Sequence, residues 1–389
     1  ALTTLENRAF SNCRALAGTV TIPNGVTAID YQTFSGCTSL QSVTAGSLTS
    51  IGTSAFEGCT TLASMTCSGT ADLTIGNNAF IRCSSLGSVS LGGAVSIGTN
   101  AFYQCTSLAS ADFSKVTTIG NSAFFQCTAL TSISMPKVVT IDVSAFQGCS
   151  ALIGTSGGNL STDNLQTVGN SAFRDCRNLI GFTGNSIVTV GDTAFYNCTS
   201  LVSALSMPNV TTIGSQAFGL TAVSSFAFGK DLSSIGTDAI FQDLNLSSIT
   251  VDSSNQSYTT VEGLLYDKSV NVLMICPAKM VKNGLIIPDT VNTIYKSAFY
   301  HSSITGEVVL PEYLTSVGVN AFRGSSGITS VVVKSTAATL FTVNQNNNVF
   351  YECPGITKLT VPISVQLHAV FDTGTRISEF HFTGNGASA

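Results

Sequence analysis

Apolar and polar residues follow a pattern along the chain that repeats mostly every 22 to 24 residues. The phrase Ile-Gly-x-x-Ala-Phe-x-x-Cys-x-x-Leu occurs in clean copies at residues 51–62, 75–86, 97–108 and 119–130, and looser copies reach both ends. A unit this short cannot bury its apolar face alone, so the pattern predicts coils that stack into a solenoid with one continuous core. The aromatic anchor of each unit should point into that core. The anchors are Phe10, Phe34, Phe56, Phe80, Phe102, Phe124, Phe146, Phe173, Phe195, Phe218, Phe299, Phe322, Phe350 and Phe371, with Ile240 in the same place once.

A β-strand is predicted after each anchor, beginning at the Leu six positions on. In residues 130–135 the side chains of Ile133 and Met135 alternate with hydroxyl residues, as expected when one face of a strand packs inward and the other meets water. The same register in four earlier units predicts one parallel sheet with a polar outer face. We take the outward positions of this sheet as the candidate binding surface: Ser42, Thr44, Ser64, Thr66, Ser88, Ser90, Ser110, Asp112, Ser132 and Ser134.

The rest of each unit is predicted to turn back towards the next strand. Six of the eight prolines stand at strand ends, where a residue without an N–H cannot continue a sheet ladder. The Ile-Gly step then turns the chain, and segments such as 121–124 indicate a short helical or 3₁₀ turn. The predicted fold is an α/β repeat solenoid, a right-handed superhelix with a parallel sheet on its concave face and short helical turns on its convex face.

One interruption of the period predicts an insertion. The anchors Ile240 and Phe299 are 59 residues apart, which is more than two units. Within this stretch, residues 258–265 and 271–276 are typical of two strands around the polar turn 266–269. We expect one β-hairpin inserted at residues 252–284 in a single solenoid domain that spans residues 1–389. Its aromatic pair, Tyr258 and Tyr266, could belong to a binding surface, and we favour a small local core.

Ten of the twelve cysteines lie three residues after an anchor. Three interpretations compete: disulfides, a metal array, and a stack of buried thiols. One Cys per coil gives neither a Cys-x-x-Cys pair nor a His partner for zinc. Helices on the convex side would keep neighbouring coils too far apart for disulfides, because helix axes need about 8–10 Å. We therefore favour buried free thiols, and for Cys67 and Cys276, outside the stack, ordinary core packing.

The repeated phrase carries a family resemblance. Together with the strand-end prolines and the segments 261–268 (Val-Glu-Gly-Leu-Leu-Tyr-Asp-Lys) and 273–279 (Leu-Met-Ile-Cys-Pro-Ala-Lys), it resembles the BspA-like leucine-rich repeat proteins, also called the Treponema pallidum type. The resemblance covers essentially the whole chain. It implies an exported protein, extracellular or on the cell surface, of mucosal or gut bacteria or of some protist parasites. It also implies roles in adhesion, co-aggregation and the binding of host matrix proteins.

Composition limits the partners. Charged residues make up only 10% of the chain, and 16 Lys and Arg against 21 Asp and Glu give a net charge of −5, with no basic block for nucleic acid. The mean hydropathy is +0.36, yet the uncharged stretches are rich in Ser, Thr, Asn and Gly, so we expect no membrane insertion of this fragment. We expect neither a cofactor nor a metal ion, and a monomer.

Candidate catalytic residues are few. The histidines are His301, His368 and His381, and no Gly-x-Ser-x-Gly, His-Glu-x-x-His or phosphate-loop phrase accompanies them. Glu379 and His381 should share the outer face of a terminal strand, where a solvated face is a better interpretation than an acid/base pair. The sequence therefore predicts a protein that is not an enzyme.

Three functions remain open. The first is a binding or adhesion module that offers its sheet to a host or neighbouring-cell protein. The second is a glycan or mucin binder, which would need exposed aromatic platforms; the chain has no Trp. The third is a passive spacer that holds another domain. We favour the first.

Overall fold

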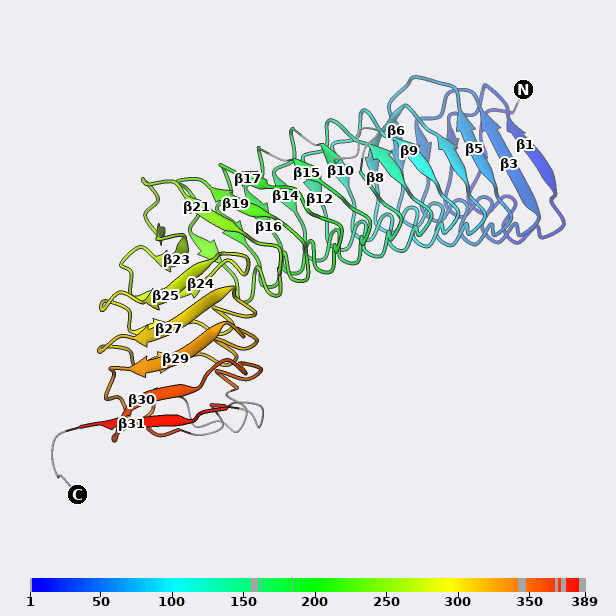
Figure 1. Ribbon diagram of the computed structural model, residues 1–389. Helices are drawn as coiled ribbons and strands as arrows, with labels where there is room; N and C mark the ends of the chain where they lie inside the picture. The colour runs from blue at the N-terminus through cyan, green and yellow to red at the C-terminus, as the bar shows by residue number, and fades with distance from the viewer. Residues whose placement is uncertain are drawn as a thin grey trace. The chain divides into compact units, whose positions relative to one another are not determined.

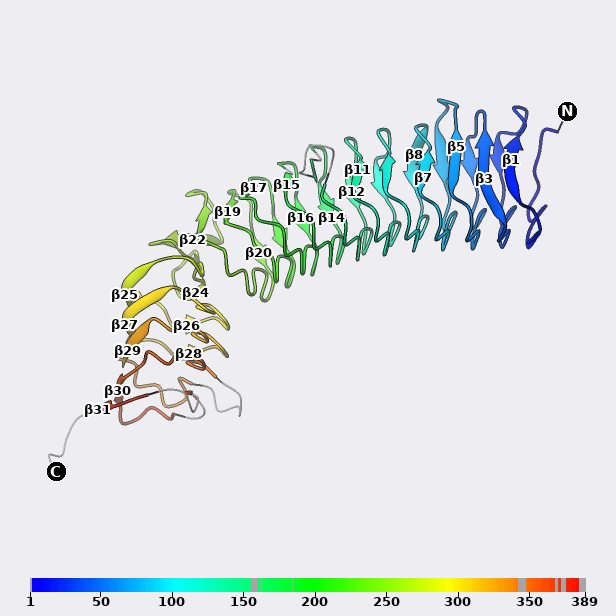
Figure 2. The same ribbon diagram turned by 45° about the vertical axis from the view of Figure 1, so that its right-hand side comes forward.

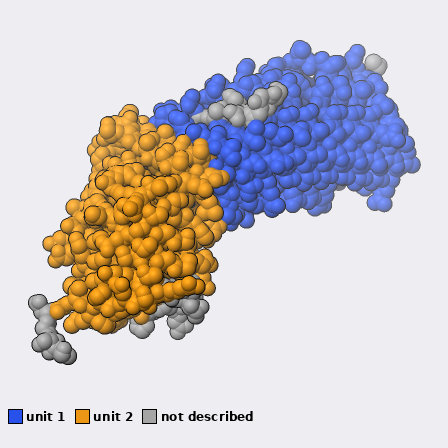
Figure 3. All heavy atoms as spheres, viewed as in Figure 1, with its two compact units in different colours: residues 1–222, 234–240 blue, residues 223–233, 241–389 orange. Residues whose placement is uncertain are grey.

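The computed structural model describes residues 2–154, 160–161, 163–183, 185–341, 348–367, 370–371 and 376–384. Within these ranges the chain forms β-strands joined by turns, and no helix is present. The strands belong to two compact units, one of residues 1–222 and 234–240 and the other of residues 223–233 and 241–389 (Figure 3). The single domain expected for residues 1–389 stays a prediction, and each unit is described by itself.

The predicted parallel sheet is present in unit 1, with its coils side by side in chain order (Figure 1). Each strand pairs in parallel with the strand of the next coil, as Ser132 does with Ser110. The strands of this six-stranded sheet are β1 (Gly18–Ile22), β3 (Leu40–Ala45), β5 (Ser64–Cys67), β7 (Ser88–Ser90), β9 (Ser110–Asp112) and β11 (Ser132–Ser134). Later coils contribute β13 (Leu160–Ser161), β15 (Phe182–Thr183) and β17 (Leu205–Met207).

A second parallel ladder runs through unit 1, where the sequence indicated only a turn (Figure 2). Ile119 pairs with Ile97 on one side and with Ile141 on the other. The Ile of the Ile-Gly phrase is therefore a strand residue, and β-branched side chains suit such a position. The ten strands are β2 (Ala28–Ile29), β4 (Ser50–Ile51), β6 (Leu73–Ile75), β8 (Ala94–Ile97), β10 (Thr118–Ile119), β12 (Thr140–Ile141), β14 (Thr167–Val168), β16 (Thr189–Val190), β18 (Thr212–Ile213) and β20 (Ser234–Ile235).

The Gly after this Ile is required by the close approach of successive coils. A Cβ atom placed on Gly120 would lie 2.7 Å from the backbone carbonyl carbon of Gly98 in the preceding coil. Real Cβ contacts are longer, so any larger residue would force the coils apart. The phrase keeps Gly here for packing between coils, because only Gly lets two backbones approach so closely.

The helical or 3₁₀ turns expected on the convex face are not confirmed. In residues 98–105 the N–H of Ala101 bonds to the carbonyl of Gly98, as in a single tight turn. Asn100 and Gln104 then adopt the left-handed conformation, with φ of 55° and 56°. A right-handed helix cannot pass through such residues, because the left-handed conformation reverses the path of the backbone. The segment is a series of tight turns of the kind that places a positive φ at the third residue.

The hydrogen bonds between coils give a second reason why no helix forms. In the turn segment, every second N–H points to the next coil: Asn100 donates to the carbonyl of Asn121 at 2.9 Å, and Phe102 donates to that of Ala123 at 2.7 Å. A helix would need these donors for itself. The turn segment is therefore a third row of backbone hydrogen bonds between coils.

The aromatic anchors form a buried stack, as predicted. The rings of Phe102 and Phe124 lie 5.1 Å apart between centroids and are parallel within 6°. From Phe34 to Phe218 the anchors of unit 1 are fully buried. Phe10 is 38% exposed because it has an anchor on one side only, that of Phe34.

Unit 2 repeats the same plan. One parallel sheet has the order β25 (Lys282–Ile286), β27 (Ile304–Leu310), β29 (Ile328–Val333), β30 (Lys358–Pro362), β31 (Glu379–Thr383). Strands β19 (Ser225–Phe228) and β21 (Ser248–Val251) pair in parallel with each other, and β26 (Thr293–Ile294) pairs with β28 (Ser316–Val317). The anchors Phe299, Phe322 and Phe350 stack within its core.

The insertion contains three strands where the sequence indicated two: β22 (Tyr258–Val261), β23 (Leu264–Asp267) and β24 (Val272–Ile275). The predicted turn after Tyr266 is present, between β23 and β24. A further two-residue turn, Glu262 and Gly263, splits the first predicted strand, and both residues have positive φ, of 50° and 82°. This is the turn geometry that favours a tight antiparallel hairpin. The third strand, β24, then joins β26 in parallel.

Candidate functional site

The ten predicted surface residues lie on one face of the sheet of unit 1, which we call the hydroxyl face. Seven are exposed, and Ser42, Ser64 and Ser132 are half-buried. The alternate positions of the same strands are buried as predicted, except that Val89 is only half-buried. The binding role of the hydroxyl face stays a prediction.

The register aligns the hydroxyl face in two columns. One column joins Ser42, Ser64, Ser88, Ser110 and Ser132 across five coils. In the other column Thr44, Thr66 and Ser90 are successive partners, and Asp112 is the partner of Ser134. Strands about 4.8 Å apart therefore present a regular array of hydroxyl groups.

Hydroxyl groups bond along the columns at the start of the stack. Thr19 and Ser42 share a hydrogen bond of 2.6 Å, and Thr44 donates to Thr21 at 3.2 Å. Asp112 is the single charged residue among the ten. A face of small neutral donors and acceptors has little electrostatic steering, and its chemistry is limited to hydrogen bonding and close packing.

A further column of hydroxyl residues was not recognised in the sequence. Thr118, Thr140 and Thr167 are successive partners in the second ladder, and Thr189, Thr212 and Ser234 continue it. Several are only half-buried. The phrase Thr-Ile-Gly recurs in the sequence. Because its Ile was assigned to a turn, the Thr before it was not recognised as a residue on the face of a sheet.

The cysteines that follow the anchors are buried and free, with one exception. Nine of these ten are buried and Cys13, in the first coil, is exposed. Burial raises the pKa of Cys59 to about 12 and raises that of Cys83 well above its ordinary value. The sequence argument against disulfides relied on widely spaced helices, and that reason is wrong, because the anchor rings are only about 5 Å apart.

Each buried thiol of this set is also a hydrogen-bond donor. The sulfur of Cys149 donates to the carbonyl of Phe124 in the preceding coil at 3.0 Å. The other eight buried thiols of this set, Cys37 among them, make the same bond at 3.0 or 3.1 Å. At Ser325, where Ser replaces Cys, the bond is kept, because Ser325 donates to the carbonyl of Phe299 at 2.6 Å; Ser302, at the same place one coil earlier, shares a hydrogen bond of 2.9 Å with the Ser325 hydroxyl. The position therefore selects a small donor, which the interpretation as a hydrophobe missed.

Comparison with known proteins assigns the family. The model of the BspA-type leucine-rich repeat region matches residues 1–95, 45–153, 159–262 and 281–387. The chain belongs to the BspA-type leucine-rich repeat family. No curated protein matches the sequence.

One of the solved structures that resemble this BspA-type protein supports the leucine-rich repeat fold. A leucine-rich repeat protein of Bacteroides ovatus is 22% identical with a TM-score of 0.65, and the match covers 94% of this chain and 92% of that one. A leucine-rich cell-surface protein of Faecalibacterium prausnitzii is 20% identical over 94% and 88% of the two chains, with a TM-score of 0.33. The leucine-rich repeat protein of T. pallidum is 26% identical over 44% and 87%, with a TM-score of 0.37. Repeat proteins with this fold commonly bind other proteins.

The candidate catalytic pair of this BspA-type protein lies in solvent. Glu379 and His381 are both more than half exposed, and Nε2 of His381 lies 3.8 Å from Oε2 of Glu379. His368 lies outside the described residues. Among the residues that the structure describes, no group of three His, Cys, Asp or Glu side chains is arranged to hold a metal ion, and no helix could span a membrane.

Proposed function

We propose that this protein is a non-enzymatic binding module that acts at the cell surface or outside the cell and binds a host or neighbouring-cell protein through its hydroxyl face. One observation carries the proposal: a column of Ser side chains runs in register along the solvent side of the sheet over five coils, and a second column of hydroxyl residues runs beside it over three of them. Stacked repeats characteristically offer such extended surfaces to protein partners. The location and the kind of partner follow the family resemblance.

The chemistry of the hydroxyl face supports a broad and shallow contact. A hydroxyl group that leaves water for a partner gains only about 0.5–1.5 kcal/mol per hydrogen bond. No aromatic or Arg residue, the types that dominate tight interfaces, is among the ten positions. We therefore expect a dissociation constant in the micromolar range or weaker for the isolated chain, with strength gained from several copies on one cell.

Glycan binding is the alternative, and the ring geometry of unit 1 disfavours a sugar platform made of Tyr103 and Phe125. Tyr103 and Phe125 on the turn segment are stacked at 4.8 Å and parallel within 6°. Each ring covers one face of the other, so the pair offers a sugar ring fewer free aromatic faces than two separate rings would. A passive spacer would bind nothing.

The test is a binding screen of the chain against extracellular matrix proteins and a glycan array. A variant with Ser88→Arg, Ser110→Arg and Ser132→Arg places three charges in one column of the hydroxyl face. It should abolish binding without lowering the melting temperature, since Ser88 and Ser110 are exposed and Ser132 is only half-buried. The matched control is Ser85→Arg, Ser107→Arg and Thr128→Arg, which adds the same charges to exposed positions of the turn segments in the same coils.

Each outcome separates the candidates. Loss of protein binding in the first variant alone supports the hydroxyl face. Equal loss in both variants would mean that added charge weakens binding wherever it lies, and the proposal would fail. Binding to the glycan array alone would favour the alternative, and no binding in either arm would favour the spacer.

A further inference from the structure

One strand of unit 2 has a free edge inside the stack. β25 pairs with β27 on one side, and it is the first strand of its sheet. The strand of the preceding coil is β21, and no Cα atom of β21 lies within 8 Å of β25. Paired strands are about 4.8 Å apart, so the insertion has separated these two strands by more than one strand spacing.

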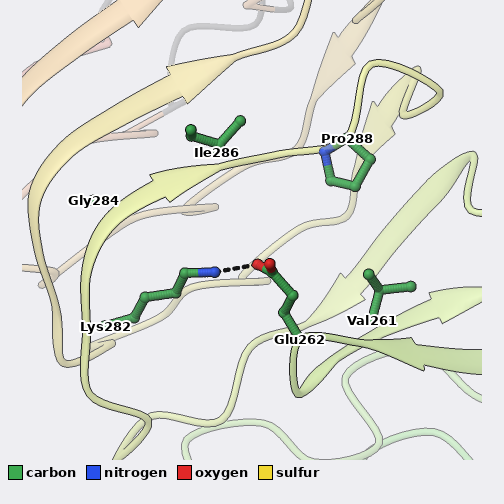
Figure 4. A pocket seen from close by; sticks show the side chains of 6 residues that line it. All are labelled: Val261, Glu262, Lys282, Gly284, Ile286 and Pro288. Atoms are coloured by element: carbon green, nitrogen blue, oxygen red, sulfur yellow. Dashed lines mark hydrogen bonds and ion pairs between the residues drawn. The ribbon is translucent and has the colours of Figure 1, made fainter.

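A groove of about 480 Å³ follows this free edge (Figure 4). Gly284, Ile286 and Pro288 lie along one wall, and Val261 and Glu262, at the tip of the β22–β23 hairpin, form the other. Both walls come from unit 2. The edge of a sheet presents a row of backbone N–H and C=O groups, which are the groups that pair with a further strand.

The side chains of β25 leave little free charge on the edge, although a β-bulge between Asn283 and Leu285 interrupts the ladder with β27. A Lys on an edge strand normally keeps other chains away. Here Lys282 is turned to Glu262 in an ion pair, and its side chain is only 26% exposed. Ile286 is 72% exposed and Val281, just before the strand, is 83% exposed. The exposed side chains of this segment are therefore apolar, at Val281 and Ile286, or polar and uncharged, at Asn283, where most edges carry charge.

The charges of the groove define what it complements. Lys282 and Glu262 neutralise each other, so the groove carries no net charge along the strand edge. One apolar row continues on the outer face of β25, β27 and β29, where Ile286 is in register with Val309 and Val309 with Val332. Glu307 and Ser330 lie two residues before this row. An uncharged segment with apolar side chains would match both surfaces.

We propose that β25 binds an extended, uncharged peptide segment of a partner protein, which pairs with its free edge as an additional strand. The backbone of the peptide bonds to β25, and its alternate side chains pack against Ile286, Pro288 and Val261, a mode in which main-chain bonds give affinity and pockets give specificity. This site lies in unit 2, apart from the hydroxyl face, and goes beyond the function proposed above.

The experiment selects peptides on the full chain. A phage-displayed library of random ten-residue peptides is panned, and the peptides obtained are synthesised and titrated against the protein by fluorescence polarisation. Affinity should fall at least tenfold with Ile286→Lys. It should be unchanged with Ile363→Lys, a matched control that is 68% exposed in the same unit. Both side chains point into solvent, so both variants should keep the wild-type melting temperature.

A second measurement identifies the binding mode. Hydrogen exchange of residues 282–286 should slow when a selected peptide is bound, because a new strand protects the edge. The proposal is overturned if panning yields no peptide, if Ile286→Lys leaves the affinity unchanged, or if residues 282–286 gain no protection. The variant with Ser88→Arg, Ser110→Arg and Ser132→Arg should bind these peptides normally, so the two proposals can fail independently.

Discussion

The thiol of Cys127 donates a hydrogen bond to the backbone carbonyl of Phe102 in the preceding coil, with 3.1 Å between sulfur and oxygen. The same carbonyl accepts the N–H of Cys105 at 3.1 Å. Both lone pairs of a buried oxygen are thus used, one within the coil and one between coils. The Cys of the repeated phrase therefore does more than fill space, because it ties each coil to the one before it.

This bond predicts an order of stability among substitutions at Cys127. Cys127→Ser should be better tolerated than Cys127→Ala, since a hydroxyl donates to the anchor carbonyl at Ser325. Alanine leaves the second bond of the carbonyl unmade and a small gap beside it, at a cost of about 1–3 kcal/mol. Urea denaturation of the two variants measures the difference. If alanine proves as stable as serine, the donor is unimportant.

The buried thiols also predict a loss of stability at alkaline pH. Burial raises the pKa of Cys59 to about 12, while in the unfolded chain a thiol ionises near pH 8.5. The folded state therefore holds protons that the unfolded state releases, and the stabilising effect is complete below about pH 8.5 and is lost as the pH rises towards 12. The melting temperature should fall over this window. The fall should be smaller in a Cys59→Ser variant, and the difference between this variant and the wild type measures the contribution of the Cys59 thiol.

Thiol reagents should distinguish one cysteine from the rest. All twelve should react in denaturant, because all are free. In the folded protein Cys13, which is exposed, should react at once, and the eleven buried thiols should react only as fast as the coils open. Ellman's reagent with and without guanidinium gives both numbers. Fewer than twelve reactive thiols in the unfolded chain would reveal disulfides and contradict the free-thiol structure.

The anchor stack predicts position-dependent losses of stability. Phe124→Ala removes a fully buried ring between Phe102 and Phe146 and should cost about 3–5 kcal/mol. Phe10→Ala should cost clearly less, because that ring is 38% exposed and stacks on one side only. Guanidinium unfolding followed by circular dichroism compares the two. Equal losses would mean that stacking between anchors contributes little.

Asn255 predicts where the insertion is most sensitive. Its side chain is fully buried and donates to the carbonyls of Gly229 and Leu232, at 3.0 Å each, while its oxygen accepts the N–H groups of Ser257 and Tyr258. Asn255→Ala would leave four backbone groups without this partner and should cost roughly 3 kcal/mol or more. The neighbouring Gln256 is exposed and serves as the control, so Gln256→Ala should be almost neutral in the same unfolding assay.

The sequence predicted the features that a repeat makes regular. The alternation of apolar and polar residues along each strand predicts which side chains point inward and that Ser88 and Ser110 point outward. The repeat of mostly 22 to 24 residues predicts the stack of anchors. The conformation of the turns did not follow. The φ of 55° at Asn100 depends on hydrogen bonds to the next coil, and periodicity alone does not show where an N–H is directed.

In the candidate sites, too, one feature was predicted from the sequence and another was not. The placement of the hydroxyl face was predicted, since it needs only the alternation along each strand. The free edge of β25 was not, because it depends on the path that the insertion takes between β21 and β25. The turn at Glu262 and Gly263 carried a weak signal, since Glu-Gly is not among the dipeptides that usually mark a two-residue hairpin turn. Without that turn, the third strand and the groove beside it could not be foreseen.

The three rows of backbone bonds between coils have a mechanical consequence. In unit 1 each coil is held at its sheet strand, at its Ile-Gly step and along its turn segment. Tension along the stack is shared by all three rows, whereas tension on one terminus peels a single coil at a time. A released coil of about 22 residues can extend by at most roughly 75 Å. Under an optical trap, unit 1 should thus lengthen in small, evenly sized steps as its coils unfold one after another. An ordinary globular domain would unfold in a single step.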